Sequence, residues 1–142
     1  MQQRDAVFQQ TLECLRYHCH PKWGDRNAVD VFNRLLAKNI RPVGWTRNTH
    51  LDIQQDQIAS RQEQWPTSDL ARLRRSHDRQ SPLSSDAPIV LAEYMGVVHL
   101  LDGHNRINRW VSEGDNRTHL VNIHAITGTG RFVELGSLLR GV

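Results

Sequence analysis

One segment in the second half of the chain brings together the residue types best suited to hold an anion. It consists of Asp102, Gly103, His104, Asn105 and Arg106. An apolar run, 97–101, precedes it and apolar residues at helical spacing follow it, so the pattern predicts a strand, a tight glycine turn and a helix start. Backbone N–H groups at a helix start lack partners within the helix, and the helix dipole favours anions there. We therefore expect a phosphate-binding site at this turn.

Four residues of the turn have roles that a phosphate site would use. Gly103 lets the backbone approach a phosphate closely, and Arg106 can bind phosphate oxygens with a forked pair of hydrogen bonds. His104 can donate a hydrogen bond or act as an acid or base. Asp102 can hold Mg²⁺ through water or orient His104. In the simpler alternative, Asp102 only caps the helix.

Two further charged residues lie near the turn in sequence. Glu93, on the preceding predicted strand, could supply a second carboxylate, or it could face solvent beside a turn. Arg109 shares a helix face with Arg106 and either adds charge to the same anion or faces solvent. The catalytic candidates are Asp102, His104 and Glu93, with Asp102 also the metal ligand. The phosphate-binding candidates are Gly103, His104, Asn105, Arg106 and Arg109.

A basic run lies shortly before the turn. Its arginines are Arg72, Arg74, Arg75 and Arg79. Such a run is usually a solvated face. If the run and the turn converge in the fold, they form a groove for a polyanion such as a nucleic acid.

The elements that must position these residues are predicted from apolar spacing and from turn residues. Around the turn we expect strands over 89–94, 97–101 and 120–126 and a helix over 104–113. Met95 and Gly96 should form the hairpin turn between the first two strands. The fold class is therefore α+β, a small mixed sheet flanked by helices.

The rest of the chain has less regular apolar spacing. Residues 1–39 form a helical part, with one helix over 6–17 and a second that Asp25 caps and that ends near Asn39. Residues 50–65 allow either a strand followed by a helix or a polar surface helix. Shorter helices are expected over 70–75, capped by Ser68 or Asp69, and over 132–139.

Length and composition favour a single domain over residues 1–142. The chain carries a net charge of +3, which permits a nucleic-acid or nucleotide partner without requiring one. No apolar run is long enough to span a membrane, and the N-terminus lacks the apolar core of a signal peptide, so we expect a cytoplasmic protein.

A cysteine and histidine cluster lies in the N-terminal part. It consists of Cys14, His18, Cys19 and His20. Cys14 and His18 are one helical turn apart and could share zinc, but no second pair follows at finger-like spacing. Reduced, partly buried thiols at a helix end explain the cluster more simply.

Residues 88–126 resemble the core of the ParB/sulfiredoxin-like superfamily. That core has a strand, a turn, a second strand ending in a glycine motif, a helix and a further strand. The sequence 101–106, Leu-Asp-Gly-His-Asn-Arg, is similar to the Asp-Gly-His-His-Arg form of the ParB-like nuclease and free-serine-kinase branches. Asn105 replaces the second histidine. The Gly-Glu-Arg-Arg signature of chromosome-partitioning ParB proteins and the sulfiredoxin cysteine are absent.

The resemblance implies a protein that binds a nucleotide or a nucleic-acid backbone. ATP or CTP and Mg²⁺ are the ligands it suggests, with phosphodiester or nucleotide hydrolysis as the reaction. A small-molecule kinase like the free-serine kinases is an alternative, which would use Glu93 as its carboxylate. A non-catalytic interaction protein that keeps the fold is the other alternative, because the superfamily carries several unrelated activities.

Overall fold

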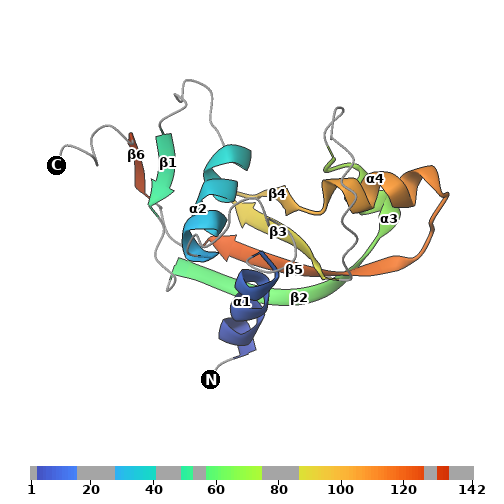
Figure 1. Cartoon of the computed structure of the whole chain (residues 1–142), viewed down its shortest axis with the longest axis horizontal. Helices are drawn as coiled ribbons and strands as arrows, with labels where there is room; N and C mark the ends of the chain where they lie inside the picture. Colours follow the sequence, from blue (N-terminus) through green and yellow to red (C-terminus); the bar gives the residue numbers. More distant parts are fainter. Residues whose placement is uncertain are drawn as a thin grey trace.

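The computed structural model describes residues 3–15, 28–40, 49–52, 57–74, 87–126 and 131–134. These residues form a mixed α+β fold (Figure 1). The helices are α1 (Gln3–Cys14), α2 (Ala28–Asn39), α3 (Thr67–Ala71) and α4 (His104–Ser112). The strands are β1 (Thr49–Asp52), β2 (Ile58–Pro66), β3 (Ile89–Tyr94), β4 (Val97–Asp102), β5 (Thr118–Ile126) and β6 (Arg131–Glu134).

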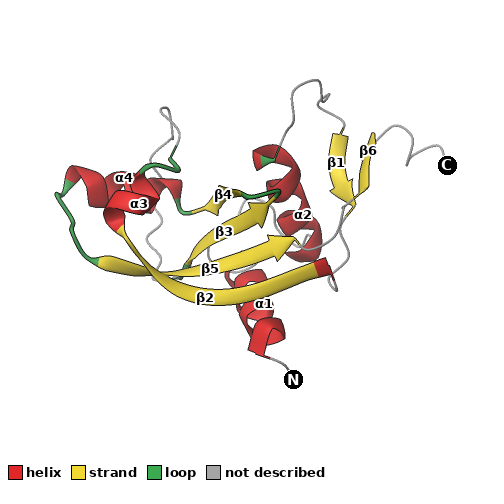
Figure 2. Ribbon diagram, turned by 180° about the vertical axis from the view of Figure 1, so that it is seen from behind, coloured by secondary structure: helices red, strands yellow, loops and turns green. Residues whose placement is uncertain are grey.

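The main sheet has four strands in the order β2-β5-β3-β4. β3 runs parallel to β5, whereas the β2–β5 and β3–β4 pairs are antiparallel. Met95 and Gly96 join β3 to β4 with φ angles of 51° and 77°, the left-handed values of a two-residue hairpin turn. β1 and β6 form a separate antiparallel pair (Figure 2). Since β4 is followed directly by α4, the Asp102–Arg106 turn lies at an edge strand of the main sheet.

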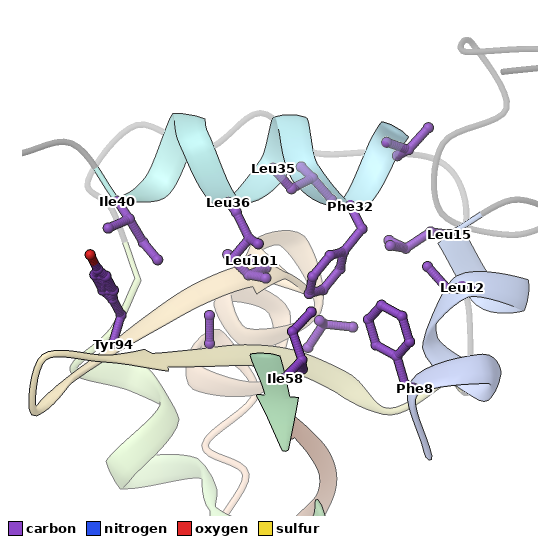
Figure 3. Packing of buried hydrophobic residues seen from close by; sticks show 13 residues of the cluster. Phe8, Leu12, Leu15, Phe32, Leu35, Leu36, Ile40, Ile58, Tyr94 and Leu101 are labelled. Atoms are coloured by element: carbon purple, nitrogen blue, oxygen red, sulfur yellow. The ribbon is translucent and has the colours of Figure 1, made fainter. Parts of the chain in front are cut away.

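The sheet buries a hydrophobic cluster on each face. α1 and α2 cover one face, where Phe8 and Phe32 meet edge to face with ring centroids 5.1 Å apart (Figure 3). α3 and α4 cover the other face, where Leu70 and Ile107 are fully buried against the strands. The two clusters leave α3 and α4 together on the side of the sheet opposite α1 and α2.

The β3–β4 pair contains a register shift close to the turn. Leu91 pairs with Leu100, but the next pair joins Val90 to Asp102, so Leu101 is an extra residue. Leu100 packs in the α3–α4 cluster and Leu101 in the α1–α2 cluster. A bulge of this kind redirects the side chains that follow it, and here it sets the end of β4 before the turn.

Polar side chains also fasten α1 to the sheet. The Thr11 hydroxyl lies 2.9 Å from Nε2 of His124, and the Ser60 hydroxyl lies 2.7 Å from Nδ1 of the same ring. The Asn122 amide donates to the Thr11 hydroxyl at 3.0 Å. Burial lowers the pKa of His124 to about 4, so the ring is neutral at pH 7.

The predicted elements from 89 to 126 are confirmed, with bounds that shift by up to two residues. The two N-terminal helices are also present, although α1 covers 3–14 rather than 6–17. Asp25, the expected cap of the second helix, lies outside the described residues. Local apolar spacing was sufficient for these elements because each buries one regular stripe or face.

Three local expectations are wrong. Residues 58–66 form a strand, since all nine residues of β2 pair with β5, and this pairing overrides their polar composition. The short helix spans 67–71, begins after Pro66 and has no side-chain cap. Residues 131–134 form β6 rather than the start of a helix, because they pair with β1, which is distant in the sequence.

Candidate functional site

The backbone conformation and the packing at position 103 require glycine. Gly103 precedes the first residue of α4 with φ of 122°, a conformation that other residues rarely adopt. A Cβ atom there would also approach Cδ1 of Ile89 to 2.4 Å. The residue at the cap position of α4 is Gly103, and Asp102 precedes it by one residue.

The Arg106 side chain points inward. Its side chain is 9% exposed, and its guanidinium donates to the carbonyl oxygen of Ala87 and to Oδ2 of Asp102, 3.4 Å away. These bonds tie α4 to the segment before β3 and to the end of β4. The expected fork toward a phosphate stays a prediction, since in the structure Nη1 and Nη2 of Arg106 each form a bond within the protein.

Asp102 faces the interior junction with α1. Its side chain is 15% exposed, and it lies near enough to Cys14 to affect that thiol electrostatically. Burial raises the pKa of the Cys14 thiol, Arg106 lowers it and Asp102 raises it. Cys14 is a free thiol, and the other members of its sequence cluster, His18, Cys19 and His20, lie outside the described residues.

The turn does not fit a Mg²⁺ site. Asp102 already accepts a hydrogen bond from a guanidinium, which neutralises the charge a cation would need. Across the described ranges, no three His, Cys, Asp or Glu side chains converge to hold a metal ion.

Glu93 is not brought to the turn. It pairs with Val98 across the hairpin, whereas Asp102 pairs with Val90, three residues further along β3, which is roughly 10 Å. The Glu93 carboxylate accepts a hydrogen bond from Arg61 at 2.9 Å. The two carboxylates proposed for catalysis therefore lie at different ends of the hairpin.

The basic run does reach the helix of the turn. Nη1 of Arg74 donates to Oδ1 of Asn108 on α4 at 3.2 Å, and α3 packs against α4. Arg72, Arg74 and Arg109 are exposed. We call this surface the arginine face; it comprises Arg72, Arg74, Asn105, Asn108 and Arg109. Arg75 and Arg79 lie outside the described residues.

The arginines whose side chains are described fall into two groups. Arg61, Arg106 and Arg117 each bond to a carboxylate. The three on the arginine face form no ion pair with any carboxylate in the part of the chain that the structure describes. Their charges therefore remain available to an external anion.

A pocket of about 230 Å³ lies beside the arginine face. It is lined by Asn39, Arg72, Leu73, Val98, His99 and Leu100. The pocket was not predicted, since its lining comes from the end of α2, the segment after α3 and the edge strand β4. Only the polar His99 within an apolar strand was a visible hint.

A second polar cluster joins α3 to the segment between α4 and β5. The Thr67 hydroxyl donates to Asp115 at 2.8 Å and lies 2.9 Å from Nε2 of His119, which stacks on Trp110 at 3.6 Å. Hydrogen bonds from the Arg117 side chain hold the pKa of Asp115 well below its usual range. Thr67 and Asp115 both contact Nε2 of His119. A proton relay through histidine uses both ring nitrogens, so this cluster does not have the geometry of a relay.

Comparisons with protein-family models, with curated proteins and with solved structures find no match for this chain. None of the described helices combines the length and apolar character required to cross a membrane. The arginine face and the pocket beside it are therefore the features of the structure from which a function can be proposed.

Proposed function

We propose that this protein binds the phosphate backbone of a nucleic acid through the arginine face. The observation that supports the proposal most strongly is that some described arginines pair with carboxylates and others do not. Arg72, Arg74 and Arg109 have no carboxylate partner among the described residues. Arg72 and Arg74 directly follow α3, and Arg109 lies on α4, against which α3 packs. Exposed arginines bind phosphate oxygens with two parallel hydrogen bonds, which makes them the residues best suited to this task.

The asparagines on α4 support the same ligand. Asn105 and Asn108 are partly exposed, one helical turn apart, and Arg109 lies one position beyond Asn108. Asparagine amides contribute hydrogen bonds to phosphate and sugar groups in nucleic-acid interfaces. Asp69 and Glu113 are also exposed on these two helices, so they lower the net charge, and we expect weak binding that is sensitive to salt.

The strand, hairpin, helix and strand order of residues 89–126 supports a ParB/sulfiredoxin-like core as part of this proposal. The ligand is nevertheless assigned to the exposed side of α4 rather than to the turn, because Arg106 is occupied internally. No observation favours the small-molecule kinase, since the carboxylate it required, Glu93, is bonded to Arg61. Nucleotide hydrolysis with Mg²⁺ likewise gains no support from the Asp102 site.

The experiment compares two single charge removals. We expect Arg109→Ala to weaken binding of a fluorescently labelled DNA duplex by about 5- to 10-fold at about 50 mM salt, because one phosphate contact is lost. Arg61→Ala removes the same charge from a residue already paired with Glu63 and Glu93, and it should change the affinity by less than about twofold.

Fluorescence anisotropy at equilibrium measures both affinities directly. Equal losses in the two variants would show that net charge alone, rather than the arginine face, determines binding. No binding of duplex or single strands to the unaltered protein at low salt would refute the proposed function.

A further inference from the structure

The pocket beside Arg72 differs from the arginine face in its chemistry. Polar groups, among them those of Asn39 and Arg72, form most of its accessible lining, and Leu73, Val98 and Leu100 supply the apolar part. Its volume of about 230 Å³ lies below the roughly 300 Å³ at which pockets for drug-sized ligands begin. It therefore suits a single flat ring system rather than a whole nucleotide.

The edge strand adds backbone groups to this pocket. β4 pairs only with β3 within the main sheet, so its other edge faces the pocket residues. In a hairpin closed by a two-residue turn, Tyr94 and Val97 exchange hydrogen bonds, and the pattern alternates from there. The backbone N–H and C=O groups of Val98 and Leu100 therefore point away from β3, toward the free edge.

Two side chains complete the polar rim. Asn39 donates its amide nitrogen to the Leu35 carbonyl at 2.9 Å, so the amide is held in place and its oxygen remains to accept a hydrogen bond. Arg72 is exposed, and among the described side chains it pairs with no carboxylate. Its guanidinium plane is a surface on which an aromatic ring can stack.

We infer that this pocket takes one unstacked nucleobase from a single-stranded nucleic acid whose backbone lies on the arginine face. The inference rests on the proposed function, because Arg72 belongs both to the face and to the pocket rim. The ring lies against the apolar side chains of the pocket, and the guanidinium of Arg72 stacks on it. The backbone groups of β4 and the Asn39 oxygen meet the alternating donors and acceptors of the base edge.

A peptide added to the edge of β4 is the competing occupant. The positive rim and the nearby arginines, which have no carboxylate partner among the described residues, favour a ligand in which a flat polar ring is joined to phosphates. An acidic peptide would meet the same charges but would have no ring to fill the pocket.

The first test needs no variant. The unaltered protein is titrated with a labelled 12-nucleotide single strand of mixed sequence and with the same-length backbone in which every base is absent. We expect the strand with bases to bind at least about fivefold more tightly, because stacking of even one base has an effect of this size. Equal affinities would overturn the inference while leaving backbone binding, and hence the proposed function, in place.

The second test fills the pocket. Val98→Trp should abolish the preference for bases and leave the affinity for the abasic strand unchanged. Val97→Trp is the matched control, because Val97 is the neighbouring exposed residue and does not line the pocket. It should keep the preference.

The variants also separate the two proposals. A Val98→Trp protein that folds and still prefers bases would refute the pocket assignment. If this variant fails to fold, as its thermal melt would show, Asn39→Ala takes its place, with a reduced preference expected. If the unaltered protein binds neither the strand with bases nor the abasic strand, the proposed function is refuted instead.

Discussion

At the residue scale, the ion pair between Asp102 and Arg106 has a structural role. These two residues are the first and last of the turn that stands out most in the sequence. Arg106 joins Ala87 and Asp102 while almost buried, so the charged groups of the motif satisfy each other. Burying one partner alone is costly, because a charge without its counter-ion loses its water without compensation. The residue types indicated the charges of this motif, but the sequence did not show that Arg106 contacts Asp102 and Ala87 within the protein.

We expect Arg106→Ala to destabilise the fold by about 3 kcal/mol, since it leaves the Asp102 carboxylate partly buried without this partner. Urea unfolding of the variant measures the loss. In the background of Asp102→Asn, the same substitution should cost clearly less, because the uncompensated charge is gone. A cost unchanged by Asp102→Asn would show that the bond to Ala87, rather than the ion pair, accounts for the stability.

At the scale of elements, α1 depends on a buried polar contact with the sheet. His124 is fully buried, bonded to Thr11 and Ser60, and flanked edge to face by Phe8 and Phe32. The alternation of Asn122 and His124 with apolar residues in β5 was visible in the sequence. Their partners on α1 and β2 were not, because those contacts join residues more than 60 positions apart.

The low pKa of His124 predicts acid sensitivity. Its pKa falls from 6.5 to about 4 on folding, so the unfolded chain binds a proton more readily. The stabilisation is complete above pH 6.5 and is lost as the pH falls toward 4, with a total loss of about 3 kcal/mol.

Urea unfolding at pH 7, 6, 5 and 4 measures this dependence. His124→Gln should be less stable at pH 7 but should lose much less stability between pH 6.5 and 4. If the variant shows the same decline as the unaltered protein, other histidines are responsible.

The elements around the turn could be predicted because each has a regular apolar pattern closed by glycine. β2 could not, because its Gln-rich sequence is a strand only by pairing with β5. Likewise, the arginine run could be identified by type, but its contact with Asn108 depends on the packing of α3 against α4. The pocket beside Arg72 escaped prediction for the same reason, since three distant segments form it.

At the scale of the whole molecule, the described arginines divide into three on the arginine face and three that pair with carboxylates, of which Arg61 and Arg117 are also exposed. A net charge of +3 is modest, yet the described arginines that lack a carboxylate partner all belong to the arginine face. A small charge concentrated in one place acts on a polyanion more strongly than the same charge spread evenly. The sheet supports this concentration by placing α3 and α4 side by side on one of its faces.

The salt dependence of DNA binding tests this account most directly. Three arginine–phosphate contacts release counter-ions, so the logarithm of the binding constant should fall with the logarithm of salt concentration with a slope of about −2.7. In a protein carrying Arg72→Ala, Arg74→Ala and Arg109→Ala, the slope should approach zero, whereas Arg61→Ala should preserve it. An unchanged slope in the triple variant, with its fold intact, would contradict the assignment of the arginine face.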